Sequence, residues 1–170
     1  WVKCKKDYID GMGDSLDLVP IGGWRGMGRK KKWISPWLMA TYDASTGTFG
    51  SVCRVMSGFS DDFYRRKTAE YKDKLVDACP AHVRTGEACS VWFDPFEVWE
   101  IRGADITLSP VHAAGLGKLA ENTSRGLSLR FPRFLRERPD KTPSGATTVD
   151  EFVEMFSRQA QRLGAGGPSE

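Results

Sequence analysis

Cysteine and histidine are scarce in this chain of 170 residues, and neither is arranged as a recognisable site. The four cysteines form no CxxC pair, and His82 and His112 are the only histidines. A structural zinc site needs several such ligands at close spacing, so we expect no metal site in this chain. Four cysteines are also too few for a disulfide scaffold of this size, which favours reduced thiols in an intracellular protein.

Long apolar runs are missing as well. No run approaches the roughly 18 apolar residues that would span a bilayer, so we expect no membrane partner. The chain starts at Trp1 without an initiator methionine or a signal peptide, which suggests a piece of a longer protein. Hydrophobic residues make up 40% of the chain, which excludes a disordered tail, and its length favours one ordinary folded domain.

Positive charge is concentrated in three segments, although the net charge is only +3. Segments 1–6, 24–33 and 125–141 hold 14 of the 25 lysines and arginines but only two acids, Glu137 and Asp140. Such segregation is typical of a basic surface that meets a polyanion. The alternative is three solvated segments on different faces, and composition alone does not choose between the two.

Hydrophobic periodicity predicts a mainly-β fold. Pro20 restricts the first predicted strand to a sheet edge or a bulge. Turn-forming residues at 43–47 join two later strands as a hairpin. The expected strands are 16–21, 37–42, 50–56, 98–102 and 104–108.

Two helices are predicted from their N-terminal capping residues. The first begins at Ser60 and runs to about Asp77. The second opens with a capping box at 148–151, and Gly164 is expected to stop it. Short strands combined with one internal and one C-terminal helix favour an OB-fold, a five-stranded β-barrel.

Each basic segment can carry binding chemistry, and each has a plainer alternative. Lys3 and Lys5 lie on one face of a strand, where two ammonium groups can clamp a phosphate or only protect a sheet edge. Residues 22–33 form a Gly-rich basic loop with an aromatic residue near each end, suited to nucleic acid or to closing a barrel end. Segment 127–141 can bind phosphate through its arginines, or be a strand with solvated arginines and buried phenylalanines.

The order of several motifs resembles the C-terminal region of ATP-dependent DNA ligases. Residues 1–8 read W-V-K-C-K-K-D-Y, which is similar to motif V of that family, and 130–134 with 138–141 are similar to its motif VI. The resemblance covers about residues 1–163, and the segment at 146–148 favours the eukaryotic DNA ligase I branch. Further similar segments are 13–22, 58–60, 98–101 and 104–110.

This resemblance implies a division of the chain and a reaction. Residues 1–8 would be the motif V strand at the end of a nucleotidyltransferase domain, 9–163 an OB-fold domain and 164–170 a flexible tail. The family adenylates its own lysine with ATP, transfers AMP to a 5′-phosphate and seals the nick, with Mg²⁺ assisting each step. The K-x-D-G motif that carries this lysine is missing from the chain, so the chain alone is expected to be inactive.

The resemblance also implies partners and a location. The partners would be nicked duplex DNA and the rest of the ligase chain, namely its nucleotidyltransferase and DNA-binding domains. The protein would be a monomer in the nucleus, with an organellar pool as a second location, and would serve DNA replication, repair and recombination.

Individual residues acquire roles only through this resemblance. Lys3 and Lys5 match motif V lysines that contact the α-phosphate of the nucleotide. Arg138, Asp140 and Lys141 match catalytic residues of motif VI that meet the pyrophosphate leaving group when the domain closes over ATP. Phe131 would wedge into the minor groove at the nick. The DNA-binding residues implied in this way are Arg25, Arg29, Lys30, Lys31, Lys32, Arg130, Phe131 and Arg133.

Two other functions fit parts of the pattern. A non-catalytic OB-fold module that binds nucleic acid explains the segregated charge and the aromatic residues. It does not explain why Lys3, Lys5 and the 138–141 segment occur together. An RNA ligase or a capping enzyme shares the same domain plan, and sealing of DNA against RNA would separate those substrates.

Overall fold

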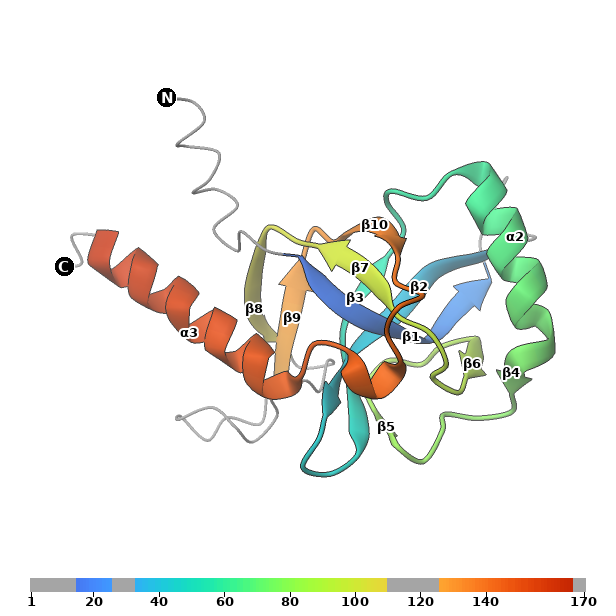
Figure 1. Ribbon diagram of the computed structural model, residues 1–170, viewed down its shortest axis with the longest axis horizontal. Coiled ribbons are helices and arrows are strands. Elements are labelled where there is room, and N and C mark those ends of the chain that lie inside the picture. The colour runs from blue at the N-terminus through green and yellow to red at the C-terminus, as the bar shows by residue number, and fades with distance from the viewer. Residues whose placement is uncertain (1–14, 26–32, 110–125, 167–170) are drawn as a thin grey trace.

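The computed structural model describes residues 15–25, 33–109 and 126–166 (Figure 1). Within these ranges strands predominate, with two α-helices and two short 3₁₀ helices. The helices are α2 (Asp61–Tyr71), η3 (Lys72–Lys74), η4 (Pro143–Gly145) and α3 (Val149–Gly166). The strands are β1 (Leu16–Arg25), β2 (Ile34–Asp43), β3 (Thr48–Val55), β4 (Leu75–Val76), β5 (Val83–Arg84), β6 (Val91–Phe93), β7 (Trp99–Arg102), β8 (Asp105–Ser109), β9 (Gly126–Arg130) and β10 (Arg133–Glu137).

Strand β1 is central in the main sheet, whose order is β10-β7-β1-β2-β3-β5, with β6 pairing to β1 and β4. On one side β1 pairs with β7 through residues 16–18 and with β6 through residues 22–23. On the other side it pairs with β2, and this ladder shifts register between Pro20 and Gly22. Proline has no N–H to donate to a ladder, so the irregularity falls where the sequence predicted it.

The predicted hairpin is confirmed as β2 and β3, which pair antiparallel from Asp43↔Thr48 to Trp37↔Val55. Its turn is closed by the backbone N–H of Gly47, which donates to the carbonyl of Asp43 at 2.7 Å. Gly47 has a positive φ of 70°, which L side chains rarely adopt. The Asp43 carboxylate accepts from the N–H of Ser45 at 3.0 Å, which further fixes the turn.

Helix α2 begins where it was predicted and ends earlier. The Ser60 hydroxyl accepts from the N–H of Phe63 at 3.0 Å, which confirms the N-cap. The predicted end near Asp77 is wrong, because α2 stops at Tyr71 and the chain passes through η3 into β4. Strand β4 pairs with β6, so a long-range ladder takes residues that local propensity would leave helical.

Helix α3 confirms its capping box. The Glu151 carboxylate accepts from the Thr148 N–H at 2.9 Å, and the Thr148 hydroxyl accepts from the Glu151 N–H at 3.1 Å. The predicted stop at Gly164 is wrong, because the helix continues to Gly166. A single glycine costs a helix interior only about 1 kcal/mol, which neighbouring residues can offset.

The mainly-β fold with an internal and a C-terminal helix is confirmed, but the described strands do not close into one barrel. Strands β8 and β9 form a separate two-stranded sheet beside the main one. Strand β7 pairs with β10, and β8 pairs with β9. The first ladder ends and the second begins at Gly103, between β7 and β8, and at Phe131, between β9 and β10. Pro132 cannot donate to a ladder at this corner, which explains the break.

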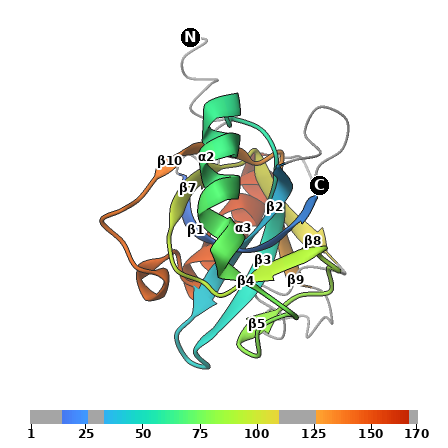
Figure 2. The same cartoon turned by 90° about the vertical axis from the view of Figure 1, so that its right-hand side faces the viewer.

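Aromatic residues dominate the larger of two hydrophobic clusters. Trp37 and Trp99 are fully buried and meet edge to face, with ring centroids 5.0 Å apart. Figure 1 shows α2 and α3 at opposite ends of the molecule, and Figure 2 looks onto α2 in front of the strands. In the described part of the chain, neither helix has the length and apolar character to cross a membrane.

Candidate functional site

A tight turn follows β10 at residues 138–141. The N–H of Lys141 donates to the carbonyl of Arg138 at 3.1 Å, which closes the turn. Pro139 occupies its second position, where the fixed φ of proline favours a turn. The N–H of Arg138 donates to the carbonyl of Val98 at 2.8 Å, so the turn is attached to the segment leading into β7.

Four charged side chains meet at this turn, and we call them the Arg138 cluster: Asp17, Arg138, Asp140 and Lys141. The Arg138 guanidinium donates to both carboxylate oxygens of Asp140, from Nε to Oδ1 at 3.1 Å and from Nη2 to Oδ2 at 2.9 Å. Its Nη1 donates to Asp17 Oδ1 at 3.0 Å, and Lys141 Nζ donates to Asp17 Oδ2 at 2.7 Å. One carboxylate of β1 therefore holds both cations of the turn.

The Arg138 cluster is fully charged and only partly covered. The side chains of Asp17 and Arg138 are 15% and 17% exposed, whereas those of Lys141 and Asp140 are 34% and 59% exposed. The hydrogen bond from Arg138 lowers the pKa of Asp140 to about 2, and the hydrogen bond to Asp140 raises the pKa of Arg138. Two cations and two anions make the cluster neutral at physiological pH.

Within the part of the chain that the structure describes, the contacts of the cluster leave donors for a ligand. The contacts above use three of the five N–H groups of Arg138 and one of the three of Lys141. A polar cavity of about 320 Å³ opens beside Lys141. The backbone N–H groups of Gly145, Ala146 and Thr147 in its wall bond to carbonyls of the chain, so Lys141 supplies its positive charge. The cavity is lined by Asp17, Lys141, Ser144, Gly145, Ala146, Thr147, Thr148 and Glu151.

Phe131 and Phe134 lie three residues apart and have opposite environments. Phe134 is buried in the core, where its ring centroid lies 4.6 Å from that of Phe63. Phe131 is 72% exposed and has a positive φ of 52°, a costly conformation for a bulky residue. The Arg130 guanidinium lies 4.8 Å from the centroid of the Phe131 ring. The interpretation of these phenylalanines as buried strand residues therefore holds for Phe134 and not for Phe131.

The Gly-rich basic loop is described only at its ends. The Arg54 guanidinium lies over Trp24, 4.3 Å from the centroid of the indole ring. Trp33 stacks on Tyr64 with the ring centroids 5.0 Å apart. The two tryptophans thus pack against residues of β3 and α2. Arg25 is exposed at the end of β1.

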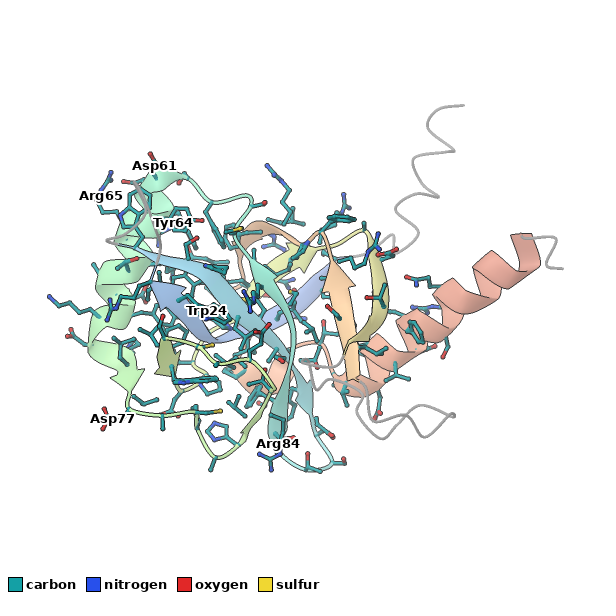
Figure 3. The ribbon with its side chains drawn as sticks, turned by 180° about the vertical axis from the view of Figure 1, so that it is seen from behind. Trp24, Asp61, Tyr64, Arg65, Asp77 and Arg84 are labelled. Carbon is teal, nitrogen blue, oxygen red and sulfur yellow. The ribbon has the colours of Figure 1, made fainter. Side chains whose placement is uncertain are left out.

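A second cavity, of about 580 Å³, is lined by Arg25 and Trp33 at the two described ends of this loop. Arg25 borders it together with Arg65 and Lys72 from the α2 side. Figure 3 shows Arg65 and Tyr64 on the same helix.

Of the other predicted site residues, Arg133 is exposed at the start of β10. Those that lie outside the described residues are Lys3, Lys5, Arg29, Lys30, Lys31 and Lys32.

One charged cluster was missed by sequence reasoning, and we call it the Lys67 cluster. The Lys67 side chain is only 2% exposed, and its Nζ lies 2.9 Å from Glu70, 3.0 Å from Glu97 and 2.8 Å from Glu137. Tyr71 donates to Glu97 at 2.6 Å. Burial acts to lower the Lys67 pKa, but hydrogen bonds to Glu137 and Glu70 outweigh it and raise the pKa. Glu137 directly precedes Arg138 in the chain.

No set of three His, Cys, Asp or Glu side chains able to hold a metal ion occurs among the described residues. The acids nearest the turn, Asp17 and Asp140, are engaged by Arg138 and Lys141. The described part of the site therefore offers Mg²⁺ no carboxylate set of its own, and we derive no step through this ion.

Comparison with known proteins identifies a family. The model of "ATP dependent DNA ligase C terminal region" matches residues 30–141. DNA ligase 6 of Arabidopsis thaliana is 51% identical over 164 residues, covering 96% of this chain and 12% of its own length. A DNA ligase of Hyperthermus butylicus is 45% identical over 163 residues, covering 96% of this chain and 26% of its own length. The chain therefore spans about an eighth to a quarter of these relatives.

A solved structure supports the fold. The ligase domain of LigD from M. tuberculosis superposes with a TM-score of 0.58 at 20% identity, covering 79% of this chain and 38% of that chain. At this level of identity the similarity speaks for the fold and not for individual residues.

Proposed function

Since the chain belongs to the ATP-dependent DNA ligases as part of their C-terminal region, we propose that it serves as the OB-fold domain of an enzyme that seals nicks in duplex DNA. That enzyme would use ATP with Mg²⁺ and pass through an enzyme–AMP and a DNA–adenylate intermediate. The observation that carries the proposal is the turn at 138–141. It presents two cations at the surface with donors left for a phosphate group.

In this proposal Arg138 and Lys141 act on the pyrophosphate that leaves ATP during adenylation. Phosphoryl transfer places negative charge on the leaving group, and fixed cations stabilise that charge without reorganising. The two hydrogen bonds to Asp140 fix the guanidinium plane of Arg138, so the remaining N–H groups of Arg138 point in defined directions. The cavity beside Lys141 lets a phosphate oxygen reach the ammonium group.

A different part of the surface would meet DNA. Phe131 projects from the corner between β9 and β10, where an apolar ring can act only by shape and stacking. Arg130 and Arg133 flank it, and their charge suits the DNA backbone. The loop residues proposed to bind DNA with them are Arg25, Arg29, Lys30, Lys31 and Lys32.

The remaining assignments stay predictions. They include the motif V strand at 1–8 with Lys3 and Lys5 at the nucleotide α-phosphate, the OB-fold domain at 9–163 and the tail at 164–170. The nuclear location, the monomeric state and the roles in replication, repair and recombination also stay predictions.

The two surfaces can be separated in the complete ligase chain. We expect Lys141→Ala to slow formation of labelled enzyme–AMP by roughly 10- to 150-fold, because a charge-assisted contact is worth about 1.5–3 kcal/mol. Sealing of a nick that is already adenylated needs no pyrophosphate site and should change much less. Phe131→Ala should spare adenylation and impair nick binding and sealing.

Two controls make this test specific. Arg158→Ala removes an exposed cation from α3, far along the chain from the turn, and should leave both steps unchanged. The thermal midpoint of Phe131→Ala should stay close to that of the parent, because this ring is not in the core. Equal damage to both steps by Lys141→Ala and Phe131→Ala would contradict the proposal, and so would sealing of nicked RNA in preference to nicked DNA.

A further inference from the structure

Asp17 occupies the centre of the Arg138 cluster although the sequence analysis gave it no role. Its two carboxylate oxygens are divided between Arg138 at 3.0 Å and Lys141 at 2.7 Å. The neighbouring Leu16 and Leu18 are buried on the opposite face of β1, as strand alternation requires. Asp17 is therefore the contact that holds both cations of the turn at a fixed separation.

Asp17 is itself held by Thr147, in the segment 146–148 that the sequence singled out. The N–H of Asp17 donates to the Thr147 hydroxyl at 2.8 Å. The N–H of Thr147 donates in return to the Asp17 carbonyl at 2.8 Å. The next residue, Thr148, caps α3, so the position of Asp17 is tied to a long helix as well as to the sheet. This reciprocal pair gives the 146–148 segment a structural task at the site.

A purely stabilising role explains Asp17 poorly. Its partner across the β1–β7 ladder is Glu100, and like charges directly opposite each other destabilise a sheet. Glu100 is compensated separately, by Arg136 at 2.7 Å and by the Ser15 hydroxyl. Glu100 thus hydrogen-bonds Arg136 and reaches Arg138 only through its charge, whereas Asp17 hydrogen-bonds both cations of the turn.

We infer that Asp17 is a positioning residue for adenylation, which orients Arg138 and Lys141 toward the leaving pyrophosphate without touching it. The inference rests on the proposed function. Without the Asp17 charge, Lys141 loses its anchor and its ammonium group samples the adjacent cavity. The two cations then no longer present a paired site, and the transition state of adenylation loses part of its stabilisation.

The test uses the complete ligase chain with Asp17→Asn, which keeps the shape and one acceptor oxygen and removes the charge. We expect adenylation by ATP to slow about tenfold, as for one weakened charge-assisted contact. Sealing of a pre-adenylated nick should change less than about twofold. The matched comparison is Glu100→Gln on the neighbouring strand, which removes the same charge without breaking a hydrogen bond to Arg138 or Lys141 and should slow adenylation clearly less than Asp17→Asn.

Each outcome has one meaning when Lys141→Ala is measured in parallel. If Lys141→Ala and Asp17→Asn both slow adenylation and neither slows sealing of the adenylated nick, the inference is supported. Slowing by Lys141→Ala with no effect of Asp17→Asn overturns the inference and leaves the proposed function intact. Faster adenylation by Asp17→Asn would show that Asp17 competes with phosphate, which also overturns it. Equal slowing of both steps with a fall in melting temperature would assign Asp17 a structural role only. No effect of Lys141→Ala would instead remove the proposed function.

Discussion

The Lys67 cluster and the Arg138 cluster are built from the same kinds of side chain but leave different chemistry unused. The three N–H groups of the Lys67 ammonium face three carboxylates, and the side chain is almost completely buried. Arg138 and Lys141 are partly exposed and keep donors after their internal contacts are made. Saturation of the donors assigns the first cluster a structural role, whereas the donors left in the second are what the proposed contact with pyrophosphate requires.

The strongest test of this contrast is removal of the buried cation. We expect Lys67→Met to destabilise the domain by about 3–5 kcal/mol, because Glu97 and Glu137 are left without the charge that compensates their burial. Urea denaturation of the 170-residue chain measures the effect. Lys74→Met, which removes an exposed lysine one turn after α2, should cost less than about 1 kcal/mol. Similar losses for the two variants would show that the Lys67 cluster is not a stabilising centre.

The pH dependence of stability gives a second, smaller test. Burial acts to raise the pKa of Glu137, but the hydrogen bonds from Lys67 and Arg66 outweigh it and hold the pKa below its usual value. A carboxylate with a lowered folded-state pKa contributes stability above the unfolded-state pKa of about 4.3, and this contribution is lost as the pH falls through the folded-state pKa.

Glu137→Gln should therefore cost about 1.5–3 kcal/mol at pH 7, as expected for losing hydrogen bonds to charged groups. At an acidic pH below the lowered folded-state pKa, the parent carboxyl is protonated as well, so the difference between variant and parent should shrink. Urea denaturation at the two pH values measures this. A constant difference across the range would mean that the charge of Glu137 contributes nothing to folding.

The smallest stability effect is expected in the Arg138 cluster. Lys141→Ala should lower the free energy of unfolding by no more than about 1 kcal/mol, because the ammonium group is solvated and partly exposed ion pairs contribute little. Thermal melts of Lys141→Ala and Lys67→Met, run in parallel, measure the two losses of stability. A loss as large as that of Lys67→Met would erase the distinction between the two clusters.

What the sequence predicted correctly was decided by near neighbours. Ser60 and Thr148 cap their helices through contacts three residues away, and Pro20 marks a bulge through its own missing N–H. The end of α2 depended instead on a ladder between β4 and β6, which no local pattern records.

Neither cluster could be predicted from the sequence, because residues far apart in the chain form it. Glu97 and Glu137 reach Lys67 from 30 and 70 residues further along the chain, so a lysine in a charged helix reads as solvated. Asp17 reaches Arg138 from 121 residues away. The motif resemblance supplied the turn at 138–141, but only the folded chain identifies the acid that holds it.

The bend between β9 and β10 also bears on how the domain behaves at high concentration. A bare aromatic ring at a strand corner is a point at which identical molecules can stick together. Here the same bend puts the Arg130 guanidinium over the Phe131 ring and exposes Arg133 beside it. Two molecules that approach through their phenylalanines therefore bring arginines together, and this repulsion, weakened by the Arg130–Asp105 ion pair at 2.8 Å, opposes self-association. The DNA of the proposed function would meet attraction from the same arginines.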